Sequence, residues 1–346
     1  MKTALTYDDI SLVPAYSEIE SRQNIDLTTQ LTTNYSLRVP LIASPMDTVC
    51  DSKMAIAMAR LGGVGCIHRF MTIDEQAEEV QNVKFAVYDD IFVTPFDSEF
   101  EIPIMAAIGA NGDYLERAKE LTNSGANVIL IDVAHGHHKF VKEALFNLKK
   151  ILPSYVDIIA GNVATSHAAI DLEFWGADAI RVGIGGGSLC TTRVQTGFGI
   201  PNVTSLQECA DAVTVPIIAC GGIKSSGDIA KALAVGASSV ILGSLLAGTD
   251  ETPGEIIQRP HGHVKKYRGA ASRETKLVHG QQQRNVEGES TYVPYKGPVG
   301  LVVDNLMDGL RSALSYAGSS NLSQFNPEYV VVTGAGMREA KPHLLT

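Results

Sequence analysis

The chain is short of the residues on which several protein classes depend. Its 346 residues include one tryptophan and five cysteines, an odd number with no C-x-x-C or C-x-x-H spacing. A disulfide framework and a zinc site built on cysteine are therefore improbable. No window approaches the ~18 consecutive apolar residues of a membrane helix. The first residues reach Asp8 and Asp9 without the apolar stretch of a signal peptide. We expect a soluble protein of a reducing compartment, the cytoplasm, with no membrane partner.

Basic charge is also scarce, since the net charge is −10 and the sequence pI is about 5.4. A nucleic-acid surface would be basic and clustered, so we expect no nucleic-acid partner. Apolar residues make up 45% of the chain and charged residues 19%, which permits a sizeable core. An anionic substrate would need local help from backbone N–H groups, helix N-termini or a few arginines.

Short, continuously apolar runs recur along the chain, each ending in a small or acidic residue and followed by a helical pattern. Such runs are typical of parallel strands that are buried on both faces. Eight strand–helix units predict an α/β fold, a closed (β/α)8 TIM barrel formed by residues 1–346 as a single domain. The expected strands are residues 39–46, 63–68, 102–109, 128–134, 156–163, 179–185, 215–222 and 239–245.

Helix signals fill the segments between these runs: residues 113–124, 166–175 and 226–235 begin at Asp or Ser and end before Gly. Two stretches do not fit the repeat. Residues 85–101 predict a short irregular link, and residues 248–298 predict a long polar loop that closes over the barrel mouth as a flap. Residues 299–317 predict an outer helix.

Cys190 lies in the segment GIGGGSLCTTR, residues 183–193, which begins with a glycine-rich loop at the end of the sixth expected strand. Glycines allow the backbone to approach a ligand closely, and catalytic residues of such barrels lie at the carboxyl ends of the strands. A free cysteine is most often a small buried hydrophobe. The loop and its flanking hydroxyl groups favour a nucleophile instead.

Two further loops offer binding groups. Glycines at positions 221, 222 and 243 follow the seventh and eighth strands, where barrels commonly bind a phosphate group. Asp132 ends the fourth strand and is a candidate hydrogen-bond acceptor for a ligand. The histidines at positions 135, 137 and 138 suggest a metal site, but neighbouring loop residues rarely converge on one ion, so a metal there is improbable. By default, His261 and His263 form a solvated turn.

The chain resembles the IMP dehydrogenase / GMP reductase family from Leu5 to its C-terminus. The motif around Cys190 resembles the family's active-site loop and is highly specific. LTYDDI at residues 5–10, SPMDTV at 44–49, YKG at 295–297 and GLRS at 309–312 also match.

This resemblance implies a thioimidate between Cys190 and C2 of a purine nucleotide, a nicotinamide cofactor, a potassium ion and a homotetramer. The implied potassium ligands are carbonyls of Gly185, Gly187, Cys190 and Arg193. The implied substrate-binding residues are Met46, Ser188, Cys220, Gly221, Gly222, Gly243, Ser244, Tyr267, Gly269, Ala270, Arg284 and Gly288. The implied cofactor-binding residues, some of them reaching a neighbouring subunit, are Ser21, Arg22, Arg69, Asp132, Val133, Ala134, Asn162, Gly185, Arg284, Ser312 and Ser315.

Within the family, the reductase branch is favoured. The chain lacks the inserted regulatory domains and the flap Arg-Tyr pair of dehydrogenases, and RNVEG at residues 284–288 resembles the reductase pattern Arg-x-x-Glu-Gly. Thr192 and Glu287 would then handle protons as ammonia leaves. This implies NADPH-dependent conversion of GMP to IMP. Residues 132–137 and 333–339 look more dehydrogenase-like, so oxidation of IMP to XMP with NAD is the alternative. A flavin-linked barrel enzyme and a non-catalytic nucleotide sensor are further alternatives.

The loop departs from the family pattern at two positions. Gly186 replaces a proline, which predicts a looser loop. Cys220 replaces the aspartate that accepts hydrogen bonds from the ribose hydroxyls in both branches. A thiol is a weak acceptor without charge, so the resemblance predicts an altered sugar preference, for example for a 2′-deoxynucleotide.

Overall fold

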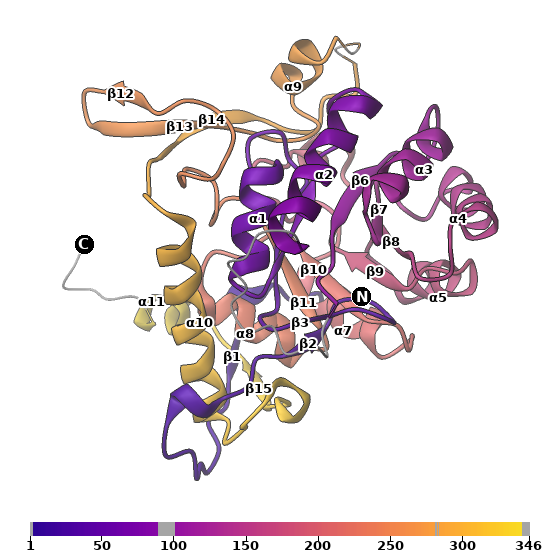
Figure 1. Cartoon of the computed structure of the whole chain (residues 1–346). Coiled ribbons are helices and arrows are strands. Elements are labelled where there is room, and N and C mark those ends of the chain that lie inside the picture. Colours follow the sequence, from indigo (N-terminus) through magenta and orange to yellow (C-terminus); the bar gives the residue numbers. More distant parts are fainter. Residues whose placement is uncertain (1–2, 89–100, 281, 283, 341–346) are drawn as a thin grey trace.

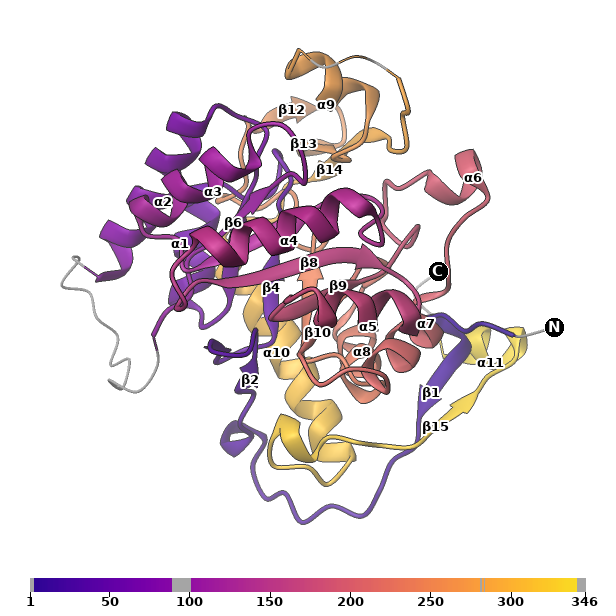
Figure 2. The same cartoon turned by 90° about the vertical axis from the view of Figure 1, so that its right-hand side faces the viewer.

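A computed structural model describes residues 3–88, 101–280, 282 and 284–340, and its centre is a closed barrel of eight parallel strands. Helices surround the barrel (Figures 1 and 2). The predicted (β/α)8 fold is therefore confirmed, and all eight predicted runs are barrel strands. They are β4 (Leu41–Ala43), β5 (Val64–Ile67), β6 (Met105–Ile108), β7 (Val128–Asp132), β8 (Asp157–Val163), β9 (Ala179–Val182), β10 (Ile217–Cys220) and β11 (Ser239–Leu242).

Successive residues of each strand divide between two buried apolar clusters, as the period of two requires. Ile42 and Ile218 belong to the cluster inside the barrel, whereas Leu41 and Ala43 pack outward against the helices. Because both faces are buried, these strands contain almost no alternating polar residues. A small hairpin, β2 (Thr29–Gln30) and β3 (Ser36–Leu37), adds Leu31 and Leu37 to the inner cluster.

The outer helices begin and end largely where local signals place them. Asp51, Thr165 and Ser225 accept backbone N–H groups at three helix starts, and Gly125 ends a fourth helix in the left-handed conformation. The helices between barrel strands are α1 (Ser52–Arg60), α2 (Ile73–Tyr88), α3 (Tyr114–Ser124), α4 (Lys139–Ile151), α5 (Ser166–Phe174), α6 (Thr192–Thr196), α7 (Asn202–Ala210) and α8 (Ser226–Ala234).

The segment 248–298, expected as a long loop, is largely ordered into secondary structure. It forms a three-stranded antiparallel sheet of β12 (Ile257–Arg259), β13 (Gly262–Arg268) and β14 (Ser290–Pro294), with α9 (Arg273–Val278) between the last two strands. Figure 1 shows this sheet projecting from the barrel. Along β13, half-buried residues alternate with the buried Lys265 and Tyr267. Polar residues of this segment therefore form part of a sheet, which the expectation of a polar loop did not include.

The remaining elements pack outside the barrel. The expected outer helix is α10 (Val299–Tyr316), and β1 (Ile10–Leu12) pairs with β15 (Tyr329–Val331) near α11 (Gly334–Glu339). The link expected at 85–101 begins later than predicted because α2 continues to Tyr88, and residues 89–100 lie outside the described part. Among the described residues, no helix has the length and apolar character needed to cross a bilayer.

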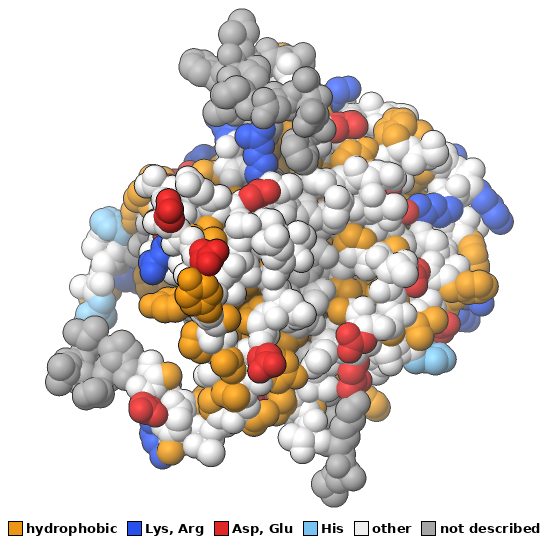
Figure 3. All heavy atoms as spheres, turned by 90° about the horizontal axis from the view of Figure 1, so that it is seen from below, with side chains coloured by type: hydrophobic (Ala, Val, Ile, Leu, Met, Phe, Trp, Pro, Cys, Tyr) orange, Lys and Arg blue, Asp and Glu red, His pale blue; other side chains and the backbone are white. Residues whose placement is uncertain are grey.

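The face opposite α9 carries no single basic patch. Figure 3, which views the molecule from that side, shows hydrophobic and acidic side chains with only scattered lysines and arginines. This agrees with the acidic composition of the chain.

Replacing Gly183 by alanine should destabilise the fold strongly. Gly183 has φ +139°, and an added Cβ would lie 2.0 Å from the carbonyl oxygen of Cys220. We expect Gly183→Ala to lower the free energy of unfolding by at least about 3 kcal/mol, measured by urea denaturation. The control is Gly112→Ala, at φ +69° with no atom within 4 Å of the added Cβ, which should cost only about 1 kcal/mol. Equal losses would contradict the steric argument.

Candidate active site

Cys190, Thr192 and Glu287 form a continuous chain of hydrogen-bonding side chains at the rim of the barrel. The Cys190 thiol donates to Oγ1 of Thr192 over 3.1 Å, and the Thr192 hydroxyl donates to Oε2 of Glu287 over 2.8 Å. All three residues are half-buried. The arrangement can pass a proton between a carboxylate and a group bound next to the sulfur.

Backbone pairing between the flap and the Cys190 loop sets this alignment. The N–H of Thr191 donates to the carbonyl of Glu287, and the N–H of Glu289 donates to the carbonyl of Leu189, both over 2.9 Å. Cys190 therefore lies opposite Gly288 in an antiparallel bridge. The bridge brings Glu287 to Thr192 although the two are 95 positions apart in sequence.

A buried carboxylate fastens the flap to the barrel, and the sequence analysis missed it. Asp47 follows β4 and is 7% exposed. Its Oδ2 accepts from Arg268 over 2.7 Å and lies 2.9 Å from Nε2 of His279. Both partners belong to the flap. The SPMDTV motif contains Asp47, but no spacing in the sequence identifies residues more than 200 positions away as its partners.

Close backbone approaches shape the Cys190 loop. Gly185 has φ +82° and packs against the side chain of Arg193, and an added Cβ at Gly186 would lie 2.9 Å from Nδ2 of Asn202. That Asn202 amide donates to the carbonyl of Gly221 over 2.6 Å. The loop is therefore tied to β10 at the position of Gly186. The looser loop expected from this glycine stays a prediction.

The carbonyl oxygens of the Cys190 loop are the type of ligand that a monovalent cation binds, since hard cations prefer oxygen ligands. The carbonyl of Gly187 accepts the N–H of Cys190 over 3.1 Å, and that of Arg193 accepts the N–H of Gly197 over 3.0 Å. Each carbonyl oxygen has a second lone pair. The predicted ligands Gly185, Gly187, Cys190 and Arg193 thus fit such an ion, although the loop itself does not identify it.

The glycine corner predicted to bind phosphate lies beside the same loop. Gly221 and Gly222 have φ values of +90° and +77°, and an added Cβ at Gly243 would lie 2.8 Å from the hydroxyl of Tyr267. That hydroxyl lies 3.1 Å from Oγ of Ser188 and 3.9 Å from Sδ of Met46. Burial raises the pKa of Tyr267, so the phenol stays protonated and can donate. The structure therefore groups several predicted substrate residues.

Other predicted substrate residues are positioned by the flap. The N–H of Gly269 donates to the carbonyl of Glu289 over 2.9 Å, and Ala270 follows it. Arg284 is exposed, and its carbonyl accepts from the ammonium group of Lys276. The carbonyl of Ser244 accepts from Lys296 over 2.8 Å. The side chain of Arg284 points to no partner that would assign it to substrate or cofactor.

A cavity of about 200 Å³ lies on the β6–β7 side of the rim and is lined by Arg69, Asn111, Val133 and His135, among others. Nε of Arg69 is buried there without a hydrogen-bond partner in the described structure. The guanidinium lies over the ring of Phe70. A cationic group with one unpartnered nitrogen beside a cavity fits an anionic cofactor such as a nicotinamide dinucleotide.

The remaining predicted cofactor residues divide into two groups. Arg181 pairs with the carboxylate of Asp132 over 2.5 Å, and the buried amide of Asn162 donates to the carbonyl of Gly183 over 2.8 Å. Ala134 follows in the same loop as Asp132 and Val133. Arg22, next to Ser21, donates to Ser312 on α10 over 2.9 Å, one turn before Ser315. In Figure 2, the C-terminal end of α10 lies far from α6, which begins two residues after Cys190, so this second group is away from Cys190.

The three histidines of the β7–α4 loop do not converge on one point. Nδ1 of His138 accepts the N–H of Phe140 as the cap of α4, and His135 lines the cavity described above. His137 points instead to Asp171 on α5. Of the turn expected at 261–263, only His261 lies in the connection of the β12–β13 hairpin, and Gly262 and His263 begin β13.

The fold and the rim residues define a (β/α)8-barrel enzyme. A family model described as the IMP dehydrogenase / GMP reductase domain matches residues 4–343, so the chain belongs to this family of purine nucleotide oxidoreductases that use a nicotinamide cofactor. The resemblance found in the sequence is confirmed at this level.

Both activities occur among its relatives. The chain is 40% identical to an inosine-5′-monophosphate dehydrogenase of Cryptosporidium parvum, covering 98% of this chain and 94% of the relative. It is 32% identical to a GMP reductase of Leishmania major, covering 98% and 96%. A solved structure of a cysteine-to-alanine variant of GMP reductase from Trypanosoma brucei, in complex with guanosine 5′-monophosphate, has a TM-score of 0.91 at 29% identity, covering 99% of this chain and 98% of that chain.

The lack of an inserted domain does not separate the two activities. The alignment with the Leishmania reductase spans 474 positions, and that with the Cryptosporidium dehydrogenase spans 383. A reductase can therefore carry a long additional segment, and a dehydrogenase can lack most of it. The missing insert therefore does not support the reductase branch, and the assignment rests on the flap residues.

His68 should make the folded protein sensitive to acid. It lies near Asp47, Glu79, His279 and Arg268, and burial lowers its pKa from 6.5 to about 4. The unfolded chain therefore binds a proton more readily, and stability falls as pH falls from 6.5 to 4, by about 3 kcal/mol. His68→Asn should flatten this part of a urea-denaturation profile. Asparagine can still accept the N–H of Phe70, which His68 accepts at Nδ1.

A matched control is His261→Asn, which changes an exposed histidine of the flap and should keep the full slope. An unchanged slope in His68→Asn would show that another group is responsible for the acid sensitivity.

Proposed function

We propose that this enzyme catalyses the NADPH-dependent reductive deamination of GMP to IMP and ammonia. The observation that carries the proposal is the chain from Cys190 Sγ through Thr192 Oγ1 to Glu287 Oε2, with separations of 3.1 and 2.8 Å. Deamination needs a nucleophile at C2 and a proton source for the departing nitrogen, and this chain of side chains offers both.

The first step is a substitution at C2 of the purine. The Cys190 thiol passes its proton through Thr192 to Glu287 as its sulfur forms a bond to C2. The bond between C2 and the exocyclic amine then breaks, and the amine leaves as ammonia with the proton that Glu287 and Thr192 return. The substrate is then held as a thioimidate. Covalent attachment divides one difficult reaction into two easier steps.

The second step releases the Cys190 sulfur from C2. NADPH, when bound, supplies a hydride to C2, the C2–sulfur bond breaks, and Cys190 recovers its proton as IMP is released. Arg69 and Val133, which line the cavity on the β6–β7 side, would hold the cofactor. Overall, GMP, NADPH and two protons give IMP, NADP⁺ and an ammonium ion, so atoms and charges balance.

Oxidation of IMP to XMP with NAD is the second candidate, because the dehydrogenases of Cryptosporidium parvum and Nitrosopumilus maritimus are 40% and 35% identical to this chain. It would use the same thiol, but no amine would leave and a water molecule would attack the thioimidate. The Glu287–Thr192 contact favours the reductive direction, since it places a proton relay beside the Cys190 sulfur, where an amine must leave.

The test is a turnover assay that follows the absorbance of the reduced cofactor, with GMP, IMP and XMP each offered with NADPH or NADP⁺ and with NADH or NAD⁺. We expect consumption of NADPH with GMP. Glu287→Gln should lower kcat by about a hundredfold to ten-thousandfold, and Cys190→Ser should abolish turnover while retaining nucleotide binding.

The matched control is Glu289→Gln, an exposed position two residues further along the flap, which should retain turnover within a few-fold. Formation of NADH from IMP and NAD⁺, without GMP-dependent oxidation of NADPH, would establish the second candidate instead.

We also propose that the enzyme works as a homotetramer with a monovalent cation in the Cys190 loop. The position of Ser21, Arg22, Ser312 and Ser315, away from their own Cys190, supports a contribution to the cofactor site of a neighbouring subunit. The backbone oxygens of the Cys190 loop support the proposal of a bound cation.

We further propose that Cys220 weakens selection for the ribose 2′-hydroxyl. It ends β10, directly before the glycine corner, and the Arg181 guanidinium interacts with its thiol. A thiol cannot replace the charged acceptor that the family resemblance places here, so 2′-deoxy-GMP should be accepted as well.

The variant Cys220→Asp tests this proposal through the ratio of kcat/KM for GMP to that for 2′-deoxy-GMP. We expect the aspartate to raise this ratio by about tenfold to a hundredfold, the value of ~1.5–3 kcal/mol for a charge-assisted hydrogen bond. Cys220→Ser, which adds no charge, should change it only a few-fold. A parent enzyme that already rejects 2′-deoxy-GMP strongly would overturn the proposal, even where the proposed reaction on GMP holds.

A further inference from the structure

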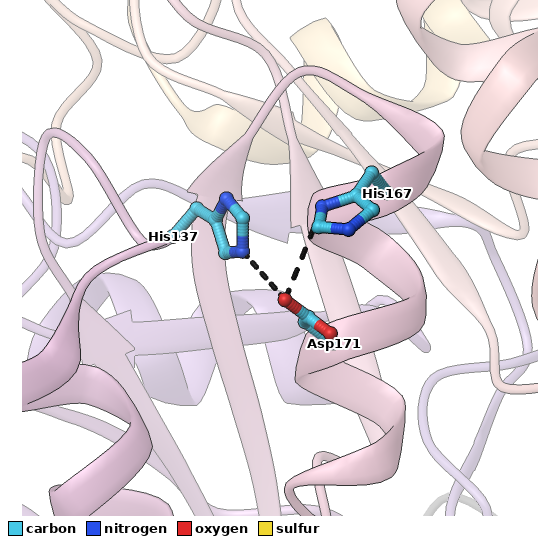
Figure 4. Close-up of side chains that lie close together, drawn as sticks. All are labelled: His137, His167 and Asp171. Atoms are coloured by element: carbon cyan, nitrogen blue, oxygen red, sulfur yellow. Dashed lines mark hydrogen bonds and ion pairs between the residues drawn. The ribbon is translucent and has the colours of Figure 1, made fainter.

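A second cluster of polar side chains lies outside the proposed active site, between the β7–α4 loop and helix α5. His137 comes from the loop, and His167 and Asp171 lie one turn apart on α5, on the same face (Figure 4). One ligand atom of each residue lies within 4.8 Å of the other two. The cluster joins residues that the sequence separates by about thirty positions.

Both imidazole rings point to the same carboxylate oxygen. Nε2 of His137 lies 2.7 Å from Oδ2 of Asp171, and Nδ1 of His167 lies 4.0 Å from that atom. Figure 4 shows the two rings on either side of the carboxylate. One histidine is enough to satisfy the carboxylate oxygen by a hydrogen bond. The second ring is therefore not needed for a simple hydrogen-bonded pair.

We propose that His137, His167 and Asp171 bind a divalent transition-metal ion of the zinc class. Two imidazoles and one carboxylate are a donor set that zinc takes in proteins, with water in the fourth position. Tetrahedral bonds of ~2.0–2.1 Å place ligand atoms ~3.4 Å apart. The separations of 2.7 and 4.0 Å lie on either side of that value, so small side-chain rotations complete the site.

The surroundings of the cluster suit an accessible but oriented site. The side chains of His137 and Asp171 are 30% and 33% exposed, and that of His167 is 79% exposed, so an ion and its water can enter. The ring of Trp175 stacks against His137 with ring centroids 5.8 Å apart and limits its orientation. The 2.7 Å contact between Nε2 of His137 and Oδ2 of Asp171 also orients the carboxylate.

One neighbouring charge opposes a cation. The ammonium group of Lys142 lies over the Trp175 ring at 5.6 Å and also lowers the pKa of Asp171. His135 is the next imidazole along the loop, and His138 is engaged as the helix cap. The Lys142 side chain can turn to solvent from its position on α4, so its charge weakens the site without filling it.

Metal binding would tie the β7–α4 loop to α5. That loop also carries Val133 and His135, which line the cavity on the β6–β7 side of the rim. The ion would therefore brace one wall of the predicted cofactor pocket without entering the chemistry. This consequence depends on the proposed function, whereas the metal site itself does not.

The test is calorimetric titration of the purified full-length protein with Zn²⁺, in a Cys190→Ser background that removes the accessible thiol as a competing ligand. Visible absorption of bound Co²⁺ is a second probe of tetrahedral coordination. We expect one zinc ion per chain. Zn²⁺ should also raise the melting temperature.

His167→Ala removes a mostly exposed side chain and should leave the fold intact. It and Asp171→Asn should each weaken zinc binding by at least about tenfold and abolish the rise in melting temperature. His261→Ala, an exposed histidine of the flap, is the matched control and should change neither. Absence of zinc binding, or binding that neither cluster variant weakens, would overturn the proposal whatever the nucleotide assays show.

Discussion

The antiparallel bridge between the flap and the Cys190 loop is the interaction on which the proposed chemistry depends. Two backbone hydrogen bonds, from Thr191 to Glu287 and from Glu289 to Leu189, fix which flap residue faces Thr192. A shift of one residue would turn the Glu287 side chain to the opposite face of the strand. The barrel alone therefore holds a thiol and a hydroxyl, and the carboxylate arrives only when the flap is docked. Asp47, through Arg268 and His279, makes that docking a charged contact with the rim.

The interior of the barrel near this rim is unusually polar for a closed sheet. Arg181 on β9 is buried, pairs with Asp132 on β7 and interacts with Cys220 on β10, and one of its nitrogens has no partner in the described structure. A buried guanidinium is stable only where acceptors surround it. The carboxylate of Asp132 is a charged acceptor for this guanidinium, and the thiol of Cys220 is not. The thiol at this position thus alters the electrostatics of the pocket beyond one lost contact with a sugar.

Much of the fold could be predicted from the sequence, because parallel strands buried on both faces leave continuous apolar runs, and glycine or capping residues mark the helix ends. Ile217–Cys220 and Ser239–Leu242 are examples. The sheet of the flap could not, because β13 alternates buried and half-buried positions and the polar Lys265 is among the buried ones, so the segment gives no strong apolar signal. The loop around Cys190 was visible as a motif, but its partner Glu287 was assigned by resemblance and reached its place by tertiary pairing. The contacts of Asp47 and the cluster of His137 with His167 join distant segments, which no local pattern encodes.

The two candidate reactions share more than their family name implies. In both, the Cys190 sulfur would bond to C2 and a hydride would move between C2 and the nicotinamide, so the barrel needs the same thiol, glycine corner and cofactor cavity for either. The difference lies at the open side, in the second group that C2 exchanges with the sulfur: an amine that leaves as the thioimidate forms, or a water molecule that attacks the thioimidate. That side is covered by the flap. A change in a few flap residues can therefore decide which reaction occurs while the barrel stays unchanged. This explains why relatives of similar overall identity carry both names. For the choice between the two reactions, the contact of Glu287 with Thr192 therefore weighs more than the identity values.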